Sequence, residues 1–236
     1  MPHTIPRPDD GLVAAIRDAP AQAGDPVRAQ GQQRYMKSAM PFRGVTTPVG
    51  RVIVRDLVRA GGPLDREAWE ATVRALFDDA AYREERYAAV ELLRHRRYAA
   101  FRDVDALPLV EHLVTTGAWW DLVDSCQPVV SELFVARPAD VEPWLRSWAV
   151  DEDLWLRRTA IIGQLGAKGD TDTDLLRDVV EANLADREFF IRKAIGWALR
   201  QHARTDPAWV RAFVESHRGS LSPLSTREAM KHLAAR

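Results

Sequence analysis

Apolar residues recur three and four positions apart along most of the chain, which is the spacing of a helix that buries one stripe. The spacing is clearest in four segments, residues 66–78, 83–97, 152–165 and 187–202. Residues 49–54 are rich in β-branched side chains, but they follow a helix start signal at Thr46, Thr47 and Pro48, so we expect a helix there too. The pattern predicts an all-α protein.

The helices are predicted to pack in hairpins. Residues suited to helix N-caps precede several apolar runs, namely Asp25, Asp65, Asp151, Thr173 and Asp206. The loops at residues 60–64, 166–172 and 203–207 are short, as between antiparallel helices. Helix-turn-helix units recur roughly every 35–45 residues, the range of HEAT and armadillo repeats. We therefore expect an α-α superhelix, a solenoid of HEAT-like helical repeats whose inner helices line a concave groove.

The ends and the apolar runs suggest the domain organisation and the compartment. Residues 1–10 contain three prolines and no apolar period, which predicts a flexible tail, and no linker interrupts residues 11–236, which predicts a single domain. No apolar run approaches the roughly 18 uncharged residues that cross a bilayer, and the N-terminus lacks the regions of a signal peptide. Cys126 is the only cysteine, which excludes an internal disulfide and a multi-cysteine zinc site. We expect a cytoplasmic protein.

Charge and familiar motifs narrow the function classes. With 33 basic and 34 acidic residues the net charge is −1, which excludes a strongly basic nucleic-acid coat but is compatible with a local basic face. The sequence has no Walker loop, GxGxxG, HExxH or GxSxG motif, which argues against P-loop hydrolysis, zinc proteolysis and the common serine hydrolase layout. The six histidines are scattered singly, and we interpret them as surface residues.

The segment WWDLVD places an indole and a carboxylate on one helical face. Trp120 and Asp124 are four residues apart and point the same way, whereas Asp121 is rotated off that face. One interpretation makes Asp124 a capping or ion-pair residue and the tryptophans core packing. The other makes them a functional pair, aimed into a cleft by a kink or a restart of the helix at Pro128.

Arg158 falls on an apolar stripe rather than on the solvent face. The stripe is formed by Leu154, Ile161 and Leu165. A guanidinium at such a position needs a partner, which is either a buried Asp or Glu or an anion gripped in the groove. The sequence leaves both alternatives open.

The segment FFIRKAIGWALR carries a glycine inside a helix pattern. Gly196 costs about 1 kcal/mol relative to Ala, so a closely packed neighbour or ligand is expected there. Trp197 is either a core residue or, with Arg192, Lys193 and Arg200 around it, part of a basic and aromatic surface.

Tyr35 is likewise an aromatic residue among basic ones, because Arg34 and Lys37 lie close to it in the sequence. The remaining tryptophans are interpreted as packing residues, namely Trp69, Trp144, Trp148, Trp155 and Trp209.

Five separated segments resemble the AlkD-type DNA alkylation repair glycosylases: RYMKSAMPFRG, WWDLVD, LWLRRTAIIGQL, FFIRKAIGWALRQHARTDP and LSPLSTREAMKHL. They span about residues 28–235 and occur in the family's order at closely matching spacings. The resemblance implies HEAT-like repeats and excision of N3- and N7-alkylated purines from duplex DNA. It also implies that no metal or organic cofactor is used and that the lesion stays stacked in the duplex.

The resemblance also implies roles for single residues. Asp124, Trp120 and Trp197 match catalytic residues, while Arg158 and Tyr35 match DNA-binding positions. The neighbours Arg192 and Lys193 extend the expected DNA-binding surface. One departure is Gly166, which stands where a basic residue is expected, and Lys168 is the candidate substitute.

These residues suit the chemistry that the resemblance implies. A cationic alkylpurine is already a good leaving group, so the barrier lies at C1′, which gains oxocarbenium character as the N-glycosidic bond stretches. An ionised Asp124 would stabilise that cation and orient water, the faces of Trp120 and Trp197 would contact the sugar and the lesion, and Arg158 would hold the adjacent phosphate.

We therefore expect a monofunctional alkylpurine DNA glycosylase. It would act as a cytoplasmic, nucleoid-associated monomer on double-stranded DNA, without a membrane partner. The sequence leaves open whether its lesions are methylpurines or bulky adducts, and whether it serves base excision repair or self-resistance to a DNA-alkylating natural product. Two other functions remain alternatives: a catalytically silent array that binds damaged DNA, and a HEAT scaffold that binds proteins.

Overall fold

A computed structural model describes residues 6–233, in which it shows thirteen α-helices, three short 3-10 helices and no strand. The prediction of an all-α protein is confirmed. The chain divides into two compact units, residues 1–102 and 103–236. That residues 11–236 form one domain stays a prediction. Residues 1–5 of the predicted tail lie outside the described residues, and Asp10 already begins the first helix.

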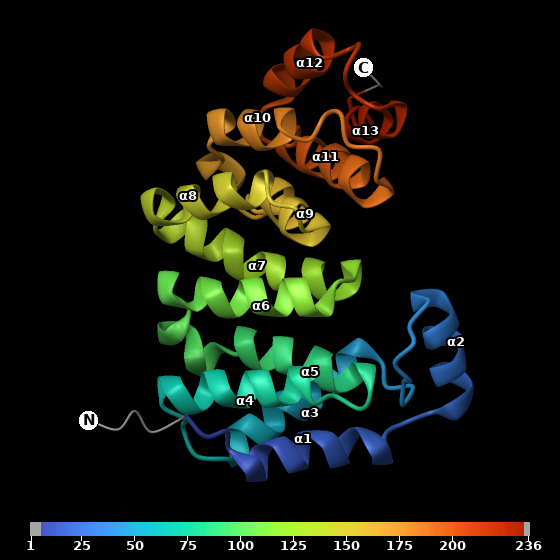
Figure 1. The fold of residues 1–236 in the computed structure, drawn as a ribbon, viewed down its shortest axis with the longest axis vertical. Helices are drawn as coiled ribbons and strands as arrows, with labels where there is room; N and C mark the ends of the chain where they lie inside the picture. The colour runs from blue at the N-terminus through green and yellow to red at the C-terminus, as the bar shows by residue number, and fades with distance from the viewer. Residues whose placement is uncertain (1–5, 234–236) are drawn as a thin grey trace. The chain divides into compact units, whose positions relative to one another are not determined.

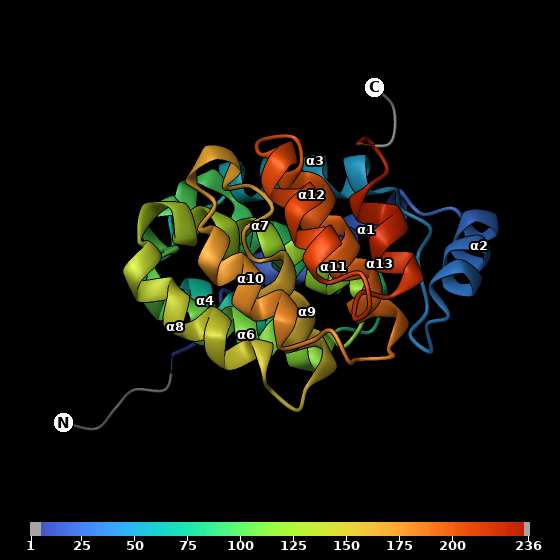
Figure 2. The ribbon, with the colours of Figure 1, turned by 90° about the horizontal axis from the view of Figure 1, so that it is seen from above.

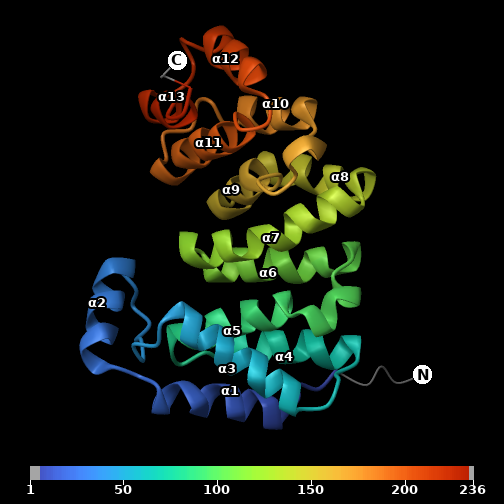
Figure 3. The ribbon, with the colours of Figure 1, turned by 180° about the vertical axis from the view of Figure 1, so that it is seen from behind.

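The first unit contains five α-helices within its described residues (Figure 1). They are α1 (Asp10–Gln22), α2 (Pro26–Met36), α3 (Thr47–Ala60), α4 (Arg66–Asp78) and α5 (Arg83–Arg94), followed by the 3-10 helix η1 (Arg96–Phe101). Helices α1, α3, α4 and α5 pack against one another. Helix α2 buries none of its residues and stands apart from the other four in this unit (Figure 3).

The second unit contains eight α-helices among its described residues. After the 3-10 helix η2 (Val104–Ala106) come α6 (Leu107–Gly117), α7 (Trp120–Ala136), α8 (Pro138–Ala149) and α9 (Leu154–Ile162). The 3-10 helix η3 (Lys168–Asp170) is followed by α10 (Thr173–Glu181), α11 (Phe189–His202), α12 (Pro207–Ser216) and α13 (Pro223–Ala229). Consecutive helices pair as α6 with α7 and α8 with α9, and α11 packs on α9. Helix α11 also packs on α13, which lies beside it in Figure 2.

The apolar period explains why these segments are helices. In α4, the segment predicted at residues 66–78, the buried side chains include Trp69, Val73, Leu76 and Phe77, which form one stripe along the helix. The β-branched segment 49–54 lies inside α3, whose Val54 and Val58 are buried. The helix prediction for that segment is confirmed.

Three predicted N-caps are confirmed and two are wrong. The side chains of Asp25, Asp65 and Asp206 accept hydrogen bonds from backbone N–H groups of the first turns that follow them. The cap of α9 is Asp153 rather than Asp151, and the cap of α10 is Asp172 rather than Thr173. Both are acidic residues near the predicted position, and a carboxylate in that place reaches two N–H groups at once.

Helix α7 continues through Pro128 from Trp120 to Ala136. Of the two alternatives predicted at this proline, the restart is therefore wrong, and the kink stays a prediction. A proline inside a helix removes one N–H donor, here the one that would bond the carbonyl of Asp124. Burial of Cys126, Gln127, Val129 and Val130 on either side holds this stretch of the helix in place.

His202 corrects the interpretation of the histidines as surface residues. Its side chain is buried at the end of α11, and its ring meets the Trp209 ring edge-on with 5.3 Å between centroids. Burial lowers the pKa of His202 from its ordinary value. The apolar stripe of α11 runs to its last residue, which carries this histidine inward.

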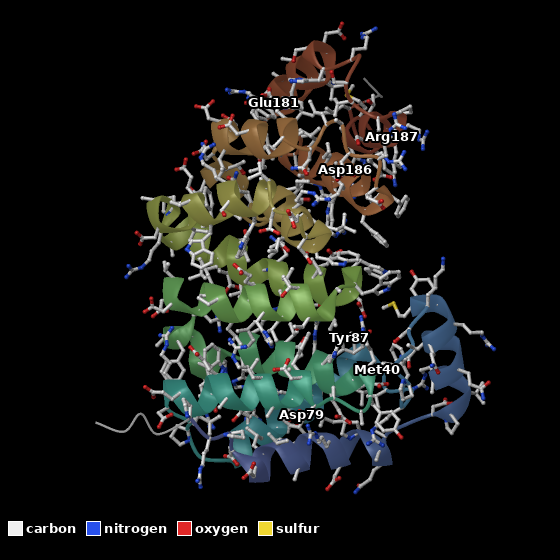
Figure 4. The ribbon with its side chains drawn as sticks, in the orientation of Figure 1. Met40, Asp79, Tyr87, Glu181, Asp186 and Arg187 are labelled. Atoms are coloured by element: carbon white, nitrogen blue, oxygen red, sulfur yellow. The ribbon has the colours of Figure 1, made fainter. Side chains whose placement is uncertain are left out.

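The segment between α2 and α3 is fixed by a buried carboxylate of α5. Glu84 accepts hydrogen bonds from the backbone N–H groups of Arg43, Gly44 and Val45 at 2.9–3.1 Å. In the same segment the Phe42 ring lies 6.3 Å from the ring of Tyr87. Figure 4 labels Tyr87 of α5 and Met40 of this segment. These contacts hold the C-terminal part of the segment that joins α2 to α3. Helix α2 itself has no buried residue.

None of the helices within residues 6–233 is long and apolar enough to cross a membrane.

Candidate functional site

A bidentate ion pair joins Asp124 of α7 to Arg158 of α9. The Arg158 Nε atom donates to Asp124 Oδ1 and its second terminal nitrogen donates to Oδ2, both at 2.8 Å. The remaining terminal nitrogen donates to the carbonyl oxygen of Phe190 at 2.7 Å. The guanidinium is thereby fixed to α7 and α11 together, and it fixes the carboxylate plane in turn.

The two partners differ in how far they reach the surface. The Arg158 side chain is 4% exposed and the Asp124 side chain is 18% exposed. The guanidinium therefore lies behind the carboxylate. Of the two alternatives for Arg158, the buried pairing with a carboxylate is the one that the structure shows, while its contact with a DNA phosphate stays a prediction.

Burial and the ion pair act on the pKa of Asp124 in opposite directions. Loss of solvent raises this pKa, and the charge of nearby Asp121 raises it further. The hydrogen bonds and the positive charge of Arg158 lower it. Burial dominates, so the pKa of Asp124 lies above the ordinary value of 3.8.

Aromatic side chains surround the guanidinium. Its central carbon lies 5.9 Å from the centroid of the Phe190 ring and 6.0 Å from that of the Trp197 ring. Phe190 in turn packs on Trp155 and Trp119, with centroids 5.0 and 5.5 Å away. The desolvated cation is thus held among π-systems.

The structure brings together some of the predicted site residues. Asp124, Arg158 and Trp197 meet around the ion pair. Trp120 begins α7 one turn before Asp124, is half-buried, and shares its helical face as predicted. These four residues come from three helices of the second unit.

The predicted basic residues are more dispersed. Lys193 pairs with Glu228 of α13 at 2.8 Å, which holds the pKa of that carboxyl below its usual range, and Arg200 pairs with the same residue. Arg192 is half-buried on α11. Tyr35 belongs to the first unit, on α2, where it is 75% exposed.

Gly196 has the close neighbour that its position predicted. A Cβ atom there would lie 2.5 Å from the Cβ of Glu228 and 3.0 Å from the carbonyl oxygen of Ser225, both on α13. The Ser225 hydroxyl also donates to the carbonyl of Arg192 at 2.8 Å. The glycine allows α13 to lie directly on the helix that carries Trp197.

The sequence of residues 16–233 matches the family described as "DNA alkylation repair enzyme". The chain belongs to this family. A solved structure entitled "Predicted DNA alkylation repair enzyme from Enterococcus faecalis" is similar to it, with a TM-score of 0.82 and 28% sequence identity over 90% of this chain and 98% of that one. No curated protein matches the chain.

Gly166 packs closely against Ser131 of α7 in this member of the DNA alkylation repair family. The Gly166 N–H donates to the hydroxyl of Ser131 at 3.0 Å, and a Cβ at residue 166 would lie 2.7 Å from the same oxygen. A larger residue would therefore require Ser131 to move. Lys168 follows two residues later, exposed and in the left-handed backbone region with a φ of 53°.

Sequence reasoning did not single out Trp119, Phe190 and Gln127 in this family member's site. Phe190 contributes a backbone carbonyl to Arg158, a contact that no side-chain pattern reveals. The only signal for Trp119 and Phe190 was the density of aromatic residues in WWDLVD and FFIRKAIGW. Among the described residues, no group of three or more His, Cys, Asp or Glu side chains could hold a metal ion.

Figure 4 labels Asp186 and Arg187 in the segment that leads into α11. Arg157, the neighbour of Arg158, donates to Asp186 at 3.1 Å and to the carbonyl of Asp151 at 2.7 Å. Two adjacent arginines of α9 thus hold different neighbours. Arg158 holds Asp124, and Arg157 holds the segment that leads into α11.

Proposed function

We propose that this protein is a monofunctional DNA glycosylase that hydrolyses the N-glycosidic bond of cationic N3- or N7-alkylated purines in duplex DNA. The observation that carries the proposal is the ion pair, in which a buried guanidinium presents a more exposed carboxylate in a fixed orientation. Membership of the DNA alkylation repair enzyme family supports DNA as the substrate.

Asp124 would act on the sugar rather than on the base. The alkylated purine carries a positive charge and leaves without a general acid. As the bond to C1′ stretches, the sugar gains oxocarbenium character, which a preorganised carboxylate stabilises. The same carboxylate would orient the attacking water. The base leaves neutral with the electron pair of the broken bond, the water oxygen bonds to C1′ and gives up a proton to solvent, and an abasic strand results.

The other residues would position and shield the reacting groups. The faces of Trp120 and Trp197 would attract the cationic lesion and sugar by about 0.5–2 kcal/mol each. Arg158 would keep Asp124 ionised and correctly turned, in addition to the phosphate contact expected from the sequence. Tyr35, Lys168, Arg192 and Lys193 remain the proposed DNA-binding residues.

The proposed DNA complex follows from the helix pairs. We propose that they continue as HEAT-like repeats in a solenoid, that duplex DNA follows its concave groove, and that the lesion stays stacked while the bond breaks. No cofactor would take part.

Product analysis tests this function. A duplex carrying N7-methylguanine is incubated with the protein, and the released purine and the abasic strand are measured together under single turnover. Free methylguanine and an alkali-labile strand in equal amounts are expected, with no release from the unmodified duplex. Binding to the damaged duplex without release would favour a silent damage-binding array, and absence of DNA binding at low salt would favour a protein scaffold.

A further inference from the structure

The surface of the first unit is hollowed beside α2. This α2 hollow has a volume of about 350 Å³ and lies among α2, the end of α1 and the segment that joins α2 to α3. Helix α2 lines it with Pro26, Ala29, Gln30 and Gln33, which follow the helical period and so form one face of the helix. Tyr35 lies on the opposite face, because it is two positions from Gln33. The hollow is therefore separate from the DNA contact that we propose for Tyr35.

Arg43 brings a guanidinium with unused hydrogen-bond donors to this hollow. The guanidinium lies over the ring of Tyr82, 3.8 Å from the ring centroid, and both residues line the hollow. None of its nitrogens donates a hydrogen bond to a residue between 6 and 233, since the nearest carboxylate oxygen, on Glu85, lies 3.8 Å from Nη2. The side chain is 22% exposed and Nε is closed off from solvent. The accessible donors are thus the two terminal nitrogens.

The carboxylates of α5 are already occupied by other donors. Glu84 accepts from the backbone N–H groups of the α2–α3 segment. Glu85 accepts from the N–H of Ala81 at 3.0 Å and lies 3.4 Å from the Nε atom of Arg17. Two guanidinium groups therefore share the single carboxylate of Glu85. A guanidinium pairs best with two oxygens of one anion, and within the described part of the chain Arg43 has no such partner.

The rest of the α2 hollow is suited to an organic molecule. Its lining includes an apolar group, namely Ala21, Pro26, Ala29 and Phe42. Apolar walls with a few polar groups are typical of sites for small molecules. Helix α2 has no buried residue, so a molecule in the hollow would cover one face of the helix and link it to α1.

We infer that the α2 hollow binds a small organic anion, a carboxylate or a phosphate monoester, whose oxygens pair with the Arg43 guanidinium and whose apolar body lies against α2. This site goes beyond the proposed glycosylase function and does not depend on it.

Matched probes test the charge of the ligand. Benzoate and phenyl phosphate carry the two kinds of anionic group on the same ring, and benzamide has the shape of benzoate without its charge. Isothermal titration calorimetry of the full chain at low salt compares the three. The better of the two anions should bind about tenfold more tightly than benzamide, because its pair with Arg43 is charge-assisted. If neither anion binds more tightly than benzamide, the inference is wrong.

Arg43→Gln should remove this preference for the anion. Arg34→Gln is the matched control, because Arg34 is an exposed residue of α2 that does not line the hollow. The control should keep the preference of the parent protein. A preference that persists in Arg43→Gln would show that the anion binds elsewhere and would overturn the inference. Thermal melting checks that both variants fold.

A second pair of variants tests the space beside α2. Gln30→Trp fills the hollow and leaves Arg43 in place, whereas Val27→Trp puts the same ring on an exposed residue of α2 outside the hollow. Gln30→Trp should weaken binding of the preferred anion by about tenfold, and Val27→Trp should leave it unchanged. Binding that Gln30→Trp does not weaken would contradict the assignment of the anion to this hollow.

Hydrogen exchange of the parent protein locates the bound anion. The preferred anion should slow exchange of the backbone amides of α2, because the helix is then held to α1 and opens less often. If exchange slows only in other helices, the site does not lie beside α2 and the inference fails.

Discussion

Asp124 is a carboxylate on which burial and an ion pair have opposite effects. Burial raises its pKa, and Arg158 limits the rise through two hydrogen bonds and its charge. The proposed chemistry needs the ionised form. Loss of activity on acidification should therefore begin at a higher pH than for an ordinary aspartate.

Arg158→Lys should shift this loss of activity on acidification to a still higher pH. An ammonium cannot form the bidentate pair, so it lowers the pKa of Asp124 less than the guanidinium does. Single-turnover release of methylguanine, measured from acid to neutral pH and corrected for spontaneous release, reports the shift. If activity in the variant is lost at the same pH as in the parent protein or at a lower pH, the role given to the Asp124–Arg158 pair is contradicted. Arg157→Lys is the matched control, because Arg157 pairs with Asp186 instead.

At this scale the sequence predicted the residues better than their partners. The helical period placed Trp120 and Asp124 on one face and Arg158 on an apolar stripe, which the burial of Arg158 bears out. The pairing of Asp124 with Arg158, 34 positions apart, depends on how α7 and α9 pack, and a periodic pattern does not contain that information. The hydrogen bond from Arg158 to the Phe190 carbonyl could not be predicted from the sequence for the same reason.

Helix α11 illustrates how one glycine sets the distance between two elements. Gly196→Ala gains helix propensity worth about 1 kcal/mol but drives its methyl group into Glu228 and Ser225 of α13. We expect a net loss of about 1–3 kcal/mol in the free energy of unfolding, because the opposing contact includes backbone. Urea denaturation measures it.

Gly50→Ala is the control for this prediction. Gly50 lies inside α3, and a Cβ there would meet nothing within 4 Å. This variant should be as stable as the parent protein or more stable, by up to about 1 kcal/mol. Equal destabilisation by both substitutions would show that the α11–α13 contact is not the cause.

Helix boundaries show where sequence reasoning works and where it fails. Residues 66–78 were predicted as the helix that α4 forms, since an aspartate cap and an apolar stripe coincide there. The segment 83–97 was predicted too long, because α5 ends at Arg94 and a 3-10 helix continues the chain. Segment 152–165 likewise shortens to Leu154–Ile162, with Gly163 at its end. Apolar spacing continues through such turns and does not mark the end of a helix.

On the scale of the whole molecule, net charge gives little help to DNA binding. Basic and acidic residues nearly cancel, 33 against 34, and many basic side chains are occupied in ion pairs, as Lys193 and Arg200 are with Glu228. Binding to duplex DNA would therefore depend on a few local cations.

Lys168→Ala should weaken binding to damaged and undamaged duplexes by similar factors. If Lys168 contacts a phosphate in place of the residue missing at Gly166, the slope of log affinity against log salt should fall in magnitude by about 1. Fluorescence anisotropy across a salt series measures this slope. Arg218→Ala is the control, since Arg218 is exposed and paired with Glu215. An unchanged slope for Lys168→Ala would assign that contact elsewhere.

The all-α class and the family could be recognised from the sequence because both depend on local patterns and motifs repeated along the chain. The division near Arg102 could not, since no change of composition or linker marks it. Packing among helices decides such a division.

The most direct test of the account compares the parent protein with Asp124→Asn on a duplex carrying N7-methylguanine. The substitution keeps the shape of the side chain and removes its charge, and Asp178→Asn, in the surface ion pair with Arg146, serves as the matched control. Single-turnover release should fall by about 10²–10³-fold in Asp124→Asn, the loss typical of one electrostatic stabiliser, while binding to the duplex is kept. Release at the parent rate would contradict the role of the Asp124 carboxylate.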